Sequence, residues 1–421
     1  MTWEQRYRLG HYARTSLVVW AGVALVAALA LAPVVRWIDR ETTWMVFGFS
    51  PDGARALLGT LVGSMLTFIV FVLSATLIVV QLASGQLTPR VIALVFAMPW
   101  VRTTLAMFTF TFAYTLSALA RVEAEVPDLH VGVAVLLNLG SIVVFFVFVE
   151  RLSGDLRPST IMRQVADRGR AVIAQVYPAA YDPADPERPP GGHLPPVPPR
   201  VVAYAGQSGV VMAFDAAGLV MAAAAAGAVV ELVPQVGDSL APGDPLFRVY
   251  GPAVSEAALH GRVAVGAERT LDQDPRFSFR ILVDVASRAL SPAVNDPTTA
   301  VLALDQLTAL LLVLGRRRLD EGVARDTAGA VRLVYGTPDW PDFVLLAVSE
   351  IRQYGVGSIQ VGRRLRAMLE RLKGELPADR LPPLEKELAL LRSSIERTYP
   401  DEEDRKRAGV ADYQGVGGSD V

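Results

Sequence analysis

Five polar residues recur every seven positions in the longest uncharged stretch of the sequence, which lies between Arg55 and Arg90. Their side chains are hydroxyls and one amide: Thr60, Thr67, Ser74, Gln81 and Thr88. On an α-helix, residues seven apart differ by only about 20° in direction, so the five form one stripe. In hydrocarbon such a stripe has to face protein or water. It is either a seam between helices, held by hydrogen bonds, or the wall of a pore to which each subunit of an oligomer contributes this helix.

Two arginines follow this stripe along the chain. Arg90 lies two residues beyond it, and Arg102 stands at the start of the next apolar stretch. If the stripe lines a pore, these two positive side chains would flank its cytoplasmic mouth. Cations at a pore mouth favour the passage of anions. A passive path that prefers anions is therefore the expectation for this part of the chain.

A second cluster of polar residues surrounds the segment Ser291–Ala300, which reads Ser-Pro-Ala-Val-Asn-Asp-Pro-Thr-Thr-Ala. Asp296 followed by Pro297 predicts a helix N-cap with proline at the first helical position. Upstream, three charged residues are spaced by four and share one face of a preceding helix. The candidates for a ligand site or a subunit contact are Arg280, Asp284, Arg288, Asn295, Asp296 and Thr299. The other interpretation is a well-capped helix–turn–helix with ordinary surface ion pairs.

The residue types that most enzymes and metal sites require are scarce or scattered. The chain has no cysteine, and its four histidines are far apart in sequence. None of its three lysines follows a glycine, so the phosphate-binding loop of ATP-driven motors is absent from the sequence. The formal net charge of −2 provides no overall basic field for nucleic acid. We therefore expect no enzyme, no cofactor, no metal and no nucleic-acid partner.

The composition predicts a membrane protein, because 52% of the residues are hydrophobic and only 19% are charged. A helix needs roughly 20 apolar residues to cross a bilayer, and the first 150 residues contain four such stretches. Their limits are 16–35, 57–83, 103–120 and 131–149. The third is the least apolar because threonine and serine interrupt it. The first, preceded by three arginines and ending in Ala28-Leu29-Ala30, also resembles a secretory signal.

Charged residues outside these stretches predict their orientation. With the amino terminus inside, ten arginines lie on inside segments near the span ends and four lie on outside loops. The positive-inside rule therefore places both termini, and the whole region after residue 150, in the cytoplasm. Within the four stretches there is no Asp, Glu, Lys, Arg or His. Coupled transporters commonly carry ionisable groups there, so active transport is disfavoured.

The rest of the sequence predicts a mixed α+β region. A helix over 151–176 is followed by a spacer over 178–199, in which nine of 22 residues are proline. Strands are predicted at 201–204, 210–212, 229–233, 245–250 and 331–335, and an alanine-rich helix at 215–226. Further helices are predicted at 276–290, 297–315, 341–354, 356–373 and 382–398. The polar, glycine-rich end of the chain from residue 401 is expected to be disordered.

Two Gly-Asp turns lie between the strands at 229–233 and 245–250, at Gly237-Asp238 and Gly243-Asp244. Glycine can supply the positive φ that such turns require. The spacing resembles the hairpins of small biotinyl- or lipoyl-carrier domains of the barrel-sandwich type. Those domains attach their cofactor to a lysine, and no lysine precedes Lys373. We therefore expect the scaffold without the carrier activity.

The predicted fold is an α-helical polytopic membrane domain with four transmembrane helices, followed by a cytoplasmic α+β region. This region contains a small β-rich, barrel-sandwich-like module and a helical bundle. The corresponding divisions of the chain are 1–150, 151–200, 201–262, 263–400 and 401–421.

Several of these segments together resemble one known family. Asp274-Pro275 and the run from Asp284 to Ala300 are similar to the signature of a bacterial family of predicted membrane proteins, domain-of-unknown-function family 2254. The runs Ser74–Arg90 and Val236–Val249 are similar to the family's second span and to its Gly-Asp hairpin. The sequence departs from the family pattern at Gln86-Leu87-Thr88, where an aromatic–serine pair is more usual. The resemblance covers residues 10–400 and implies a multi-pass protein of the bacterial inner membrane.

Taken together, these features predict a homo-oligomeric passive ion channel or permeation protein. Its cytoplasmic region would assemble the subunits or gate the path by binding a ligand near Asp296. The alternative is a non-conducting membrane scaffold or sensor that binds a cytoplasmic partner. The expected partners are the lipid bilayer and further copies of the chain, and for the alternative also a cytoplasmic protein or a small ligand.

Overall fold

The computed structural model describes residues 1–42, 48–86, 90, 98–123, 126–155, 157–184, 194–319 and 322–416. Its contacts divide the chain into two compact units. The N-terminal unit is Leu9–Arg157, and the C-terminal unit is Pro158–Val421 together with Met1–Arg8. The first residues of the chain therefore pack with its second half.

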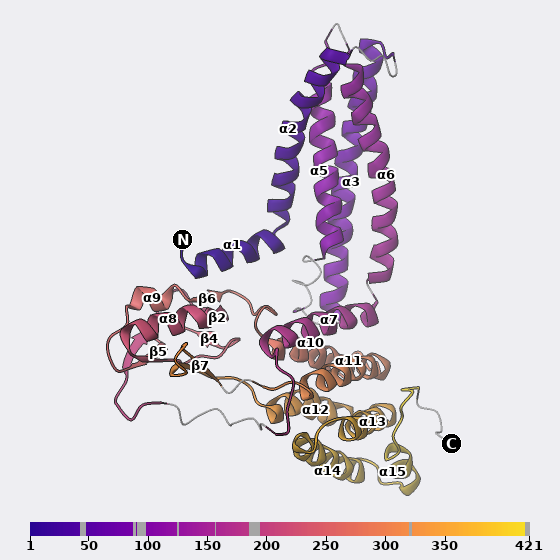
Figure 1. The fold of residues 1–421 in the computed structure, drawn as a ribbon. Helices are drawn as coiled ribbons and strands as arrows, with labels where there is room; N and C mark the ends of the chain where they lie inside the picture. The colour runs from indigo at the N-terminus through magenta and orange to yellow at the C-terminus, as the bar shows by residue number, and fades with distance from the viewer. Residues whose placement is uncertain are drawn as a thin grey trace. The chain divides into compact units, whose positions relative to one another are not determined.

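Four long helices form the N-terminal unit and lie lengthwise beside one another (Figure 1). They are α2 (Leu17–Thr42), α3 (Pro51–Gln86), α5 (Pro99–Leu119) and α6 (Asp128–Asp155). Each coincides, to within one residue at either end, with one of the four predicted spans or extends beyond it. Small buried residues, including Ala28 and Ala32 on α2 and Ala113 and Ala118 on α5, lie in the core between the helices. Small side chains let helix backbones approach closely, which is how helices associate in lipid.

Three helices of this unit are long and apolar enough to cross a membrane, over Leu17–Asp39, Pro51–Gln81 and Asp128–Leu152. The span predicted at 103–120 lies in α5, whose threonines make it the least apolar of the four. Among the described residues, a further helix passes the same length and composition criteria, α11 (Pro297–Gly315). It lies in the C-terminal unit with 61% of its most apolar window buried, so we interpret it as a core helix.

The helix α1 (Trp3–Thr15) precedes the first span and belongs partly to each unit. Its first half is held on the C-terminal unit by two hydrogen bonds. The backbone N–H of Glu4 donates to the carbonyl oxygen of Gly261 at 3.1 Å. The hydroxyl of Tyr7 donates to the Asp272 carboxylate at 2.6 Å.

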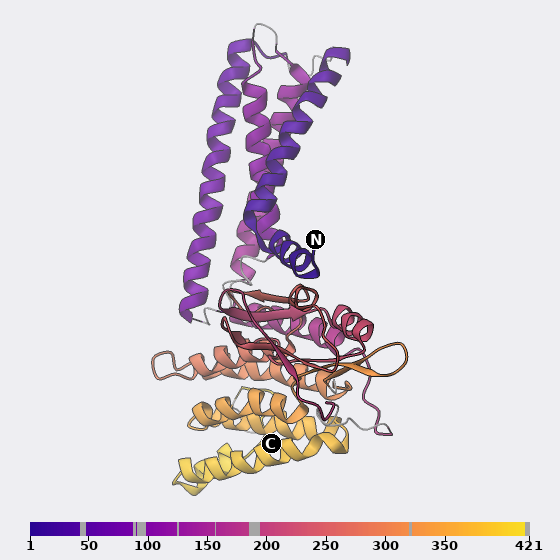
Figure 2. The ribbon, with the colours of Figure 1, turned by 90° about the vertical axis from the view of Figure 1, so that its left-hand side faces the viewer.

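Stacked helices make up one side of the C-terminal unit (Figure 2). The helices α7 (Pro158–Val176), α10 (Pro275–Ala289) and α11 contact one another. Next come α12 (Trp340–Gly355) and α13 (Ile359–Glu375), and then η2 (Ala378–Arg380), α14 (Leu381–Thr398) and α15 (Glu402–Ala408). The predicted helices between 276 and 398 are all present. Their amphipathic patterns are satisfied by burial between successive layers.

Two small sheets form the other side of this unit. The first has the order β1-β5-β3-β8-β7, and the second has the order β4-β2-β6. The first sheet comprises β1 (Arg200–Ala203), β5 (Pro245–Tyr250), β3 (Val229–Leu232), β8 (Val331–Tyr335) and β7 (Val323–Arg325). The second comprises β4 (Ser239–Leu240), β2 (Gly209–Phe214) and β6 (Val263–Gly266). The helices α8 (Ala216–Ala226) and α9 (Glu256–His260) connect strands of the two sheets.

The predicted hairpin is present, but the described strands form no closed barrel. β3 and β5 pair antiparallel, with Val229 opposite Tyr250. Gly237 and Gly243 have φ values of 94° and 93°, as expected for the two turns. β8, from far along the sequence, pairs parallel with β3. The β-rich part therefore extends beyond residue 262, because the edge of β3 that β5 leaves open is completed by this distant strand.

The predicted disorder from residue 401 is wrong for the described residues up to Val416. α15 forms within this segment, and Asp412 is 1% exposed. Arginines on α13 hold the segment by donating to its carbonyl oxygens: Arg366 to Gly409, and Arg364 to Asp412 at 3.0 Å. A polar composition did not reveal these bonds, because their donors lie some 45 residues earlier in the chain. Residues 417–421 lie outside the described part.

Candidate functional site

The polar stripe of α3 faces away from the helices of its own chain. Its described members Thr60, Thr67, Ser74 and Gln81 are all exposed, and Thr88 lies outside the described residues. A second series with the same spacing is buried against the bundle: Leu58, Met65, Val72 and Val79, each at most 5% exposed. This series runs two residues ahead of the polar one, and two residues correspond to about 200° around a helix. The stripe is therefore not a seam within this chain.

Small residues widen the stripe into a face. Ser64 and two glycines, Gly59 and Gly63, are also exposed. A Cβ atom added to either glycine would meet nothing within 4 Å. We call the set Thr60, Gly63, Ser64, Thr67, Ser74 and Gln81 the outer polar face of α3. The Gly-x-x-x-Gly spacing of Gly59 and Gly63 is the pattern by which transmembrane helices dimerise.

Three hydroxyls on this face donate to carbonyl oxygens of their own helix. Thr60 donates to Ala56 at 2.9 Å, Ser64 to Thr60 at 2.9 Å and Thr67 to Gly63 at 3.1 Å. Their hydrogen atoms are thus satisfied, while each hydroxyl oxygen keeps acceptor capacity. The face can therefore contact lipid at modest cost, and it can also accept hydrogen bonds from water or from another chain.

The hydrogen bonds that join described helices of the N-terminal unit lie away from this face. The Asp39 carboxylate on α2 accepts from the Leu129 N–H on α6 at 2.9 Å, and further bonds join α5 to α6. The Asn138 amide donates to the Thr115 hydroxyl at 2.9 Å, and Ser141 donates to the Thr111 hydroxyl at 3.1 Å. All four side chains are buried. In the sequence, the α5 threonines indicated only a lower hydropathy of this span. The spacing Thr104, Thr111, Thr115 places them on one side of the helix and was the available signal.

The bundle also buries one histidine, which lies just before the fourth predicted span. α6 begins at Asp128, three residues earlier than that span, and therefore includes His130. His130 is 0% exposed, and its Nδ1 lies 3.0 Å from the Tyr114 hydroxyl. Its Nε2 and the Oδ1 of Asn138 have no hydrogen-bond partner among the described residues. The Tyr114–His130 pair belongs to the contact between α5 and α6 and not to the outer polar face.

The two arginines proposed for a pore mouth differ in environment. Arg90 is exposed, whereas Arg102 is half-buried with its guanidinium 5.7 Å from the centroid of the Trp20 ring. Such a cation–π contact joins α5 to α2. The residues between Arg90 and Met98 lie outside the described part of the chain.

The Ser291–Ala300 segment forms the capped turn that the sequence predicts. The Asp296 carboxylate accepts hydrogen bonds from the Thr299 N–H at 3.1 Å and from the Thr299 hydroxyl at 2.6 Å. Asn295 has φ of 49°, a left-handed conformation that asparagine tolerates better than most residues. Both Asn295 and Arg288 are exposed. With both carboxylate oxygens occupied, Asp296 is primarily the cap of α11.

The charged residues upstream of this turn join two helices. Arg280 donates to Asp284 within α10 at 2.6 Å. It also forms a two-pronged ion pair with Glu350 of α12, at 2.5 and 2.8 Å. Glu350 is 70 residues away in sequence, so the spacing of α10 alone could not reveal it. The structure thus separates Arg280 and Asp284, which hold α10 to α12, from the cap at Asp296.

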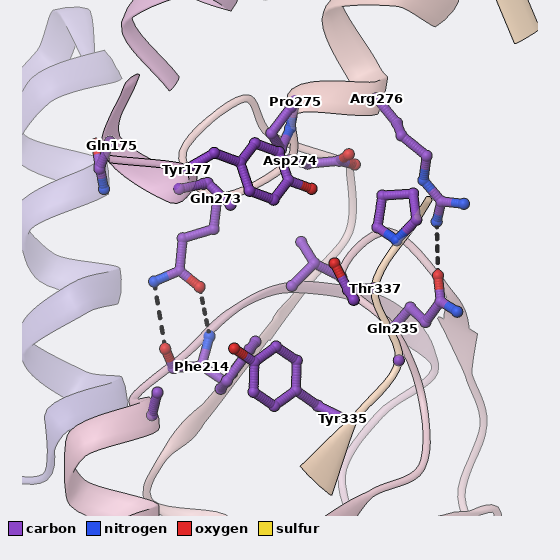
Figure 3. Close-up of a pocket in the computed structure, with 15 residues that line it drawn as sticks. Gln175, Tyr177, Phe214, Gln235, Gln273, Asp274, Pro275, Arg276, Tyr335 and Thr337 are labelled. Carbon is purple, nitrogen blue, oxygen red and sulfur yellow. Dashed lines mark hydrogen bonds between the residues drawn. The ribbon is translucent and has the colours of Figure 1, made fainter. Parts of the chain in front are cut away.

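A pocket of ≈ 210 Å³ lies within the C-terminal unit, where the ends of β2 and β8 meet the beginning of α10 (Figure 3). No local sequence pattern predicts it, because its walls come from five separate parts of the chain. Its lining residues are Gln175, Val176, Tyr177, Phe214, Ala216, Gln235, Val236, Gln273, Asp274, Pro275, Arg276, Tyr335, Gly336, Thr337 and Pro338. Of these residues, the family-like motifs of the sequence include Val236 and the pair Asp274-Pro275.

Polar side chains of the pocket are held in place by one another and by the backbone. The side-chain amide of Gln273 forms two hydrogen bonds with the backbone of Phe214. It accepts from the Phe214 N–H at 3.0 Å and donates to the Phe214 carbonyl oxygen at 3.2 Å (Figure 3). Arg276 donates to the Gln235 amide oxygen at 2.9 Å. Asp274 is 2% exposed and pairs with Arg269. Burial raises the pKa of the Asp274 carboxyl, and the positive charge of Arg269 opposes that rise.

Among the described residues, no group of three or more His, Cys, Asp or Glu side chains is placed to hold a metal ion. Two surfaces of the described residues are the candidates for a functional site. One is the outer polar face of α3, and the other is the mixed polar and aromatic pocket of the C-terminal unit.

Comparison with known proteins identifies the family of this chain. A family model described as "Predicted membrane protein (DUF2254)" matches residues 14–371. The chain therefore belongs to this family of predicted membrane proteins, as its motifs indicated, and the apolar helices of its N-terminal unit agree with that membership.

Longer relatives are found in mycobacteria. The uncharacterized proteins Rv1290c of Mycobacterium tuberculosis and Mb1321c of Mycobacterium bovis are each 31% identical to this chain over 403 residues. The alignment covers 91% of this chain and 76% of each relative. No solved structure matches the chain.

Proposed function

We propose that this membrane protein is a homo-oligomer whose subunits meet through the outer polar face of α3 and form a passive path across the bilayer. The observation that carries the proposal is the direction of that face. Thr60, Thr67 and Ser74 are turned away from the chain's own bundle, so they contact either lipid or another molecule.

Lipid is the less favourable neighbour for this face. Gln81 is exposed, and an amide with no partner is costly in hydrocarbon. A second copy of α3 offers matching hydroxyls and amides. Gly59 and Gly63 leave open space in which a neighbouring helix can approach closely. Rotational symmetry would then bring one such face per subunit to a common axis.

The packing of the first residues supports placing both ends of the chain on one side of the membrane, and the positive-inside rule makes that side the cytoplasm. Met1–Arg8 belong to the same compact unit as the second half of the chain. Glu4 and Tyr7 make the hydrogen bonds that hold them there. Two segments that pack together lie on one side of a membrane, so the chain between them crosses an even number of times. Four crossings, by α2, α3, α5 and α6, meet this requirement.

Purified protein in liposomes tests the path. We expect passive ion flux that falls in Thr67→Leu and in Ser74→Leu, with oligomer size unchanged in both. Thr103→Leu is a matched control, because Thr103 is exposed on α5 and its hydroxyl also donates to its own helix, to Pro99 at 3.0 Å. The reversal potential in a salt gradient reports whether Arg90 gives the path a preference for anions. Unchanged flux in both stripe variants would remove α3 from the path.

A non-conducting membrane sensor is the second candidate, and the pocket of the C-terminal unit is the observation that favours it. In that case the protein shows no flux in liposomes although it binds a ligand. Neither candidate assigns an enzymatic role to any residue of the chain.

A further inference from the structure

The pocket of the C-terminal unit carries an unbalanced positive charge. Two arginines act on one carboxylate here: Asp274 is paired with Arg269, and the charge of Arg276 also acts on it without an ion pair. Arg276 makes its hydrogen bond to a neutral amide, that of Gln235, and forms no ion pair with any described carboxylate. A guanidinium group has five N–H donors, so Arg276 retains donors that the described residues leave unused.

The position of Arg276 is fixed before any ligand arrives. Its partner Gln235 lies against Gly336, where an added Cβ atom would come within 2.7 Å of the Gln235 amide nitrogen. Only glycine therefore leaves room for this amide. On the other wall, Gln273 is fastened to both backbone groups of Phe214. A site whose side chains are already held loses little conformational entropy when it binds.

The remaining walls suit a flat apolar body. The rings of Phe214 and Tyr335 lie 5.0 Å apart between centroids, inclined at 60°. Val236 and Pro275 add apolar surface to the lining. A volume of ≈ 210 Å³ is small beside the usual ligand pockets of about 300–1,000 Å³. The ligand is therefore a small molecule and not a polymer or a dinucleotide.

We propose that this pocket binds a small planar carboxylate, such as an aromatic acid. The carboxylate would accept from the free N–H groups of Arg276, whose fork geometry matches two carboxylate oxygens. The ring would lie against Phe214 and Tyr335. The single unpaired cation matches a monoanion better than a phosphate, which carries more charge and requires more donors. Binding here does not depend on the passive path proposed above, since it is measured without flux.

Fluorine NMR of the full-length protein in detergent tests the site directly. The probe is 4-fluorobenzoate, and 4-fluorobenzamide is its neutral counterpart of the same shape. We expect the wild-type protein to broaden the benzoate signal and to bind the benzamide at least about tenfold more weakly. Arg276→Gln should weaken benzoate binding about ten- to a hundredfold, the usual range for a lost hydrogen bond to a charged group. Arg276→Lys keeps the charge without the fork and should lie between the two.

Arg392→Gln is the matched control, because Arg392 is exposed on α14 and lies outside the pocket; it should bind like the wild type. Equal binding of benzoate and benzamide to the wild-type protein would overturn the proposal. So would full benzoate affinity in a folded Arg276→Gln protein, or no broadening of the benzoate signal by the wild type. The benzoate–benzamide comparison needs no variant, so it decides the matter even if Arg276→Gln fails to fold.

Discussion

Single residues define the turn before α11, and Asp296 is the one whose loss should be felt most. Both oxygens of its carboxylate accept hydrogen bonds from Thr299. Asp296→Ala should therefore lower the free energy of unfolding by about 1 kcal/mol, as expected for a missing N-cap. Asp296→Asn should cost less, because asparagine caps helices about as well. Thermal unfolding of the purified protein in detergent measures both changes.

A different outcome would change the role of this turn. If Asp296→Ala kept its melting temperature but altered flux or ligand response, the cap would be incidental. Asp296 would then belong to a gating or binding site, as the first interpretation of the sequence allowed.

At this scale the sequence was informative where a residue acts on its near neighbours. The cap at Asp296, the turns at Gly237 and Gly243 and the pair Arg280–Asp284 all join positions within five residues. Glu350 and Gln235 were not predictable in the same way. Each meets its arginine only after the chain has folded back over 41 or 70 residues.

At the scale of elements, α3 presents two series of residues spaced seven apart. One series is buried and the other is exposed. The periodicity predicted that the polar series shares one face, but not which way the face points. That direction depends on where α5 and α6 pack, and α5 carries the hydroxyls that bond to α6. A helix pattern defines a face, and only its neighbours decide what covers it.

Self-association through α3 should depend on Gly63. A valine there fills the open space beside the outer polar face and keeps a neighbouring helix at a distance. Gly63→Val should therefore weaken association at least about tenfold, measured by fluorescence energy transfer between labelled copies in liposomes. Gly22→Val is the control, because Gly22 is exposed on α2 and also has nothing within 4 Å of an added Cβ. Equal weakening by both variants would contradict a specific contact at Gly63.

At the scale of the whole molecule, the chain has two units: the helical N-terminal unit, and the C-terminal unit, which also includes the first residues of the chain. The absence of native cysteine makes the topology testable with single introduced thiols. In intact cells, a membrane-impermeant maleimide should label Glu123→Cys, which is exposed between α5 and α6. It should not label Ala328→Cys, which is exposed in the C-terminal unit, until the cells are opened. Labelling in the reverse order would invert the proposed orientation.

Disulfide cross-linking of the same cysteine-free chain tests the central claim, that the outer polar face of α3 meets another copy. Thr67→Cys and Ser74→Cys are compared with Leu136→Cys, whose site is 62% exposed on α6. Under mild oxidation in native membranes, we expect covalent dimers from the two α3 variants and none from Leu136→Cys. Efficient dimers through Leu136→Cys, with none through Thr67→Cys or Ser74→Cys, would show that α3 faces lipid and would contradict the account.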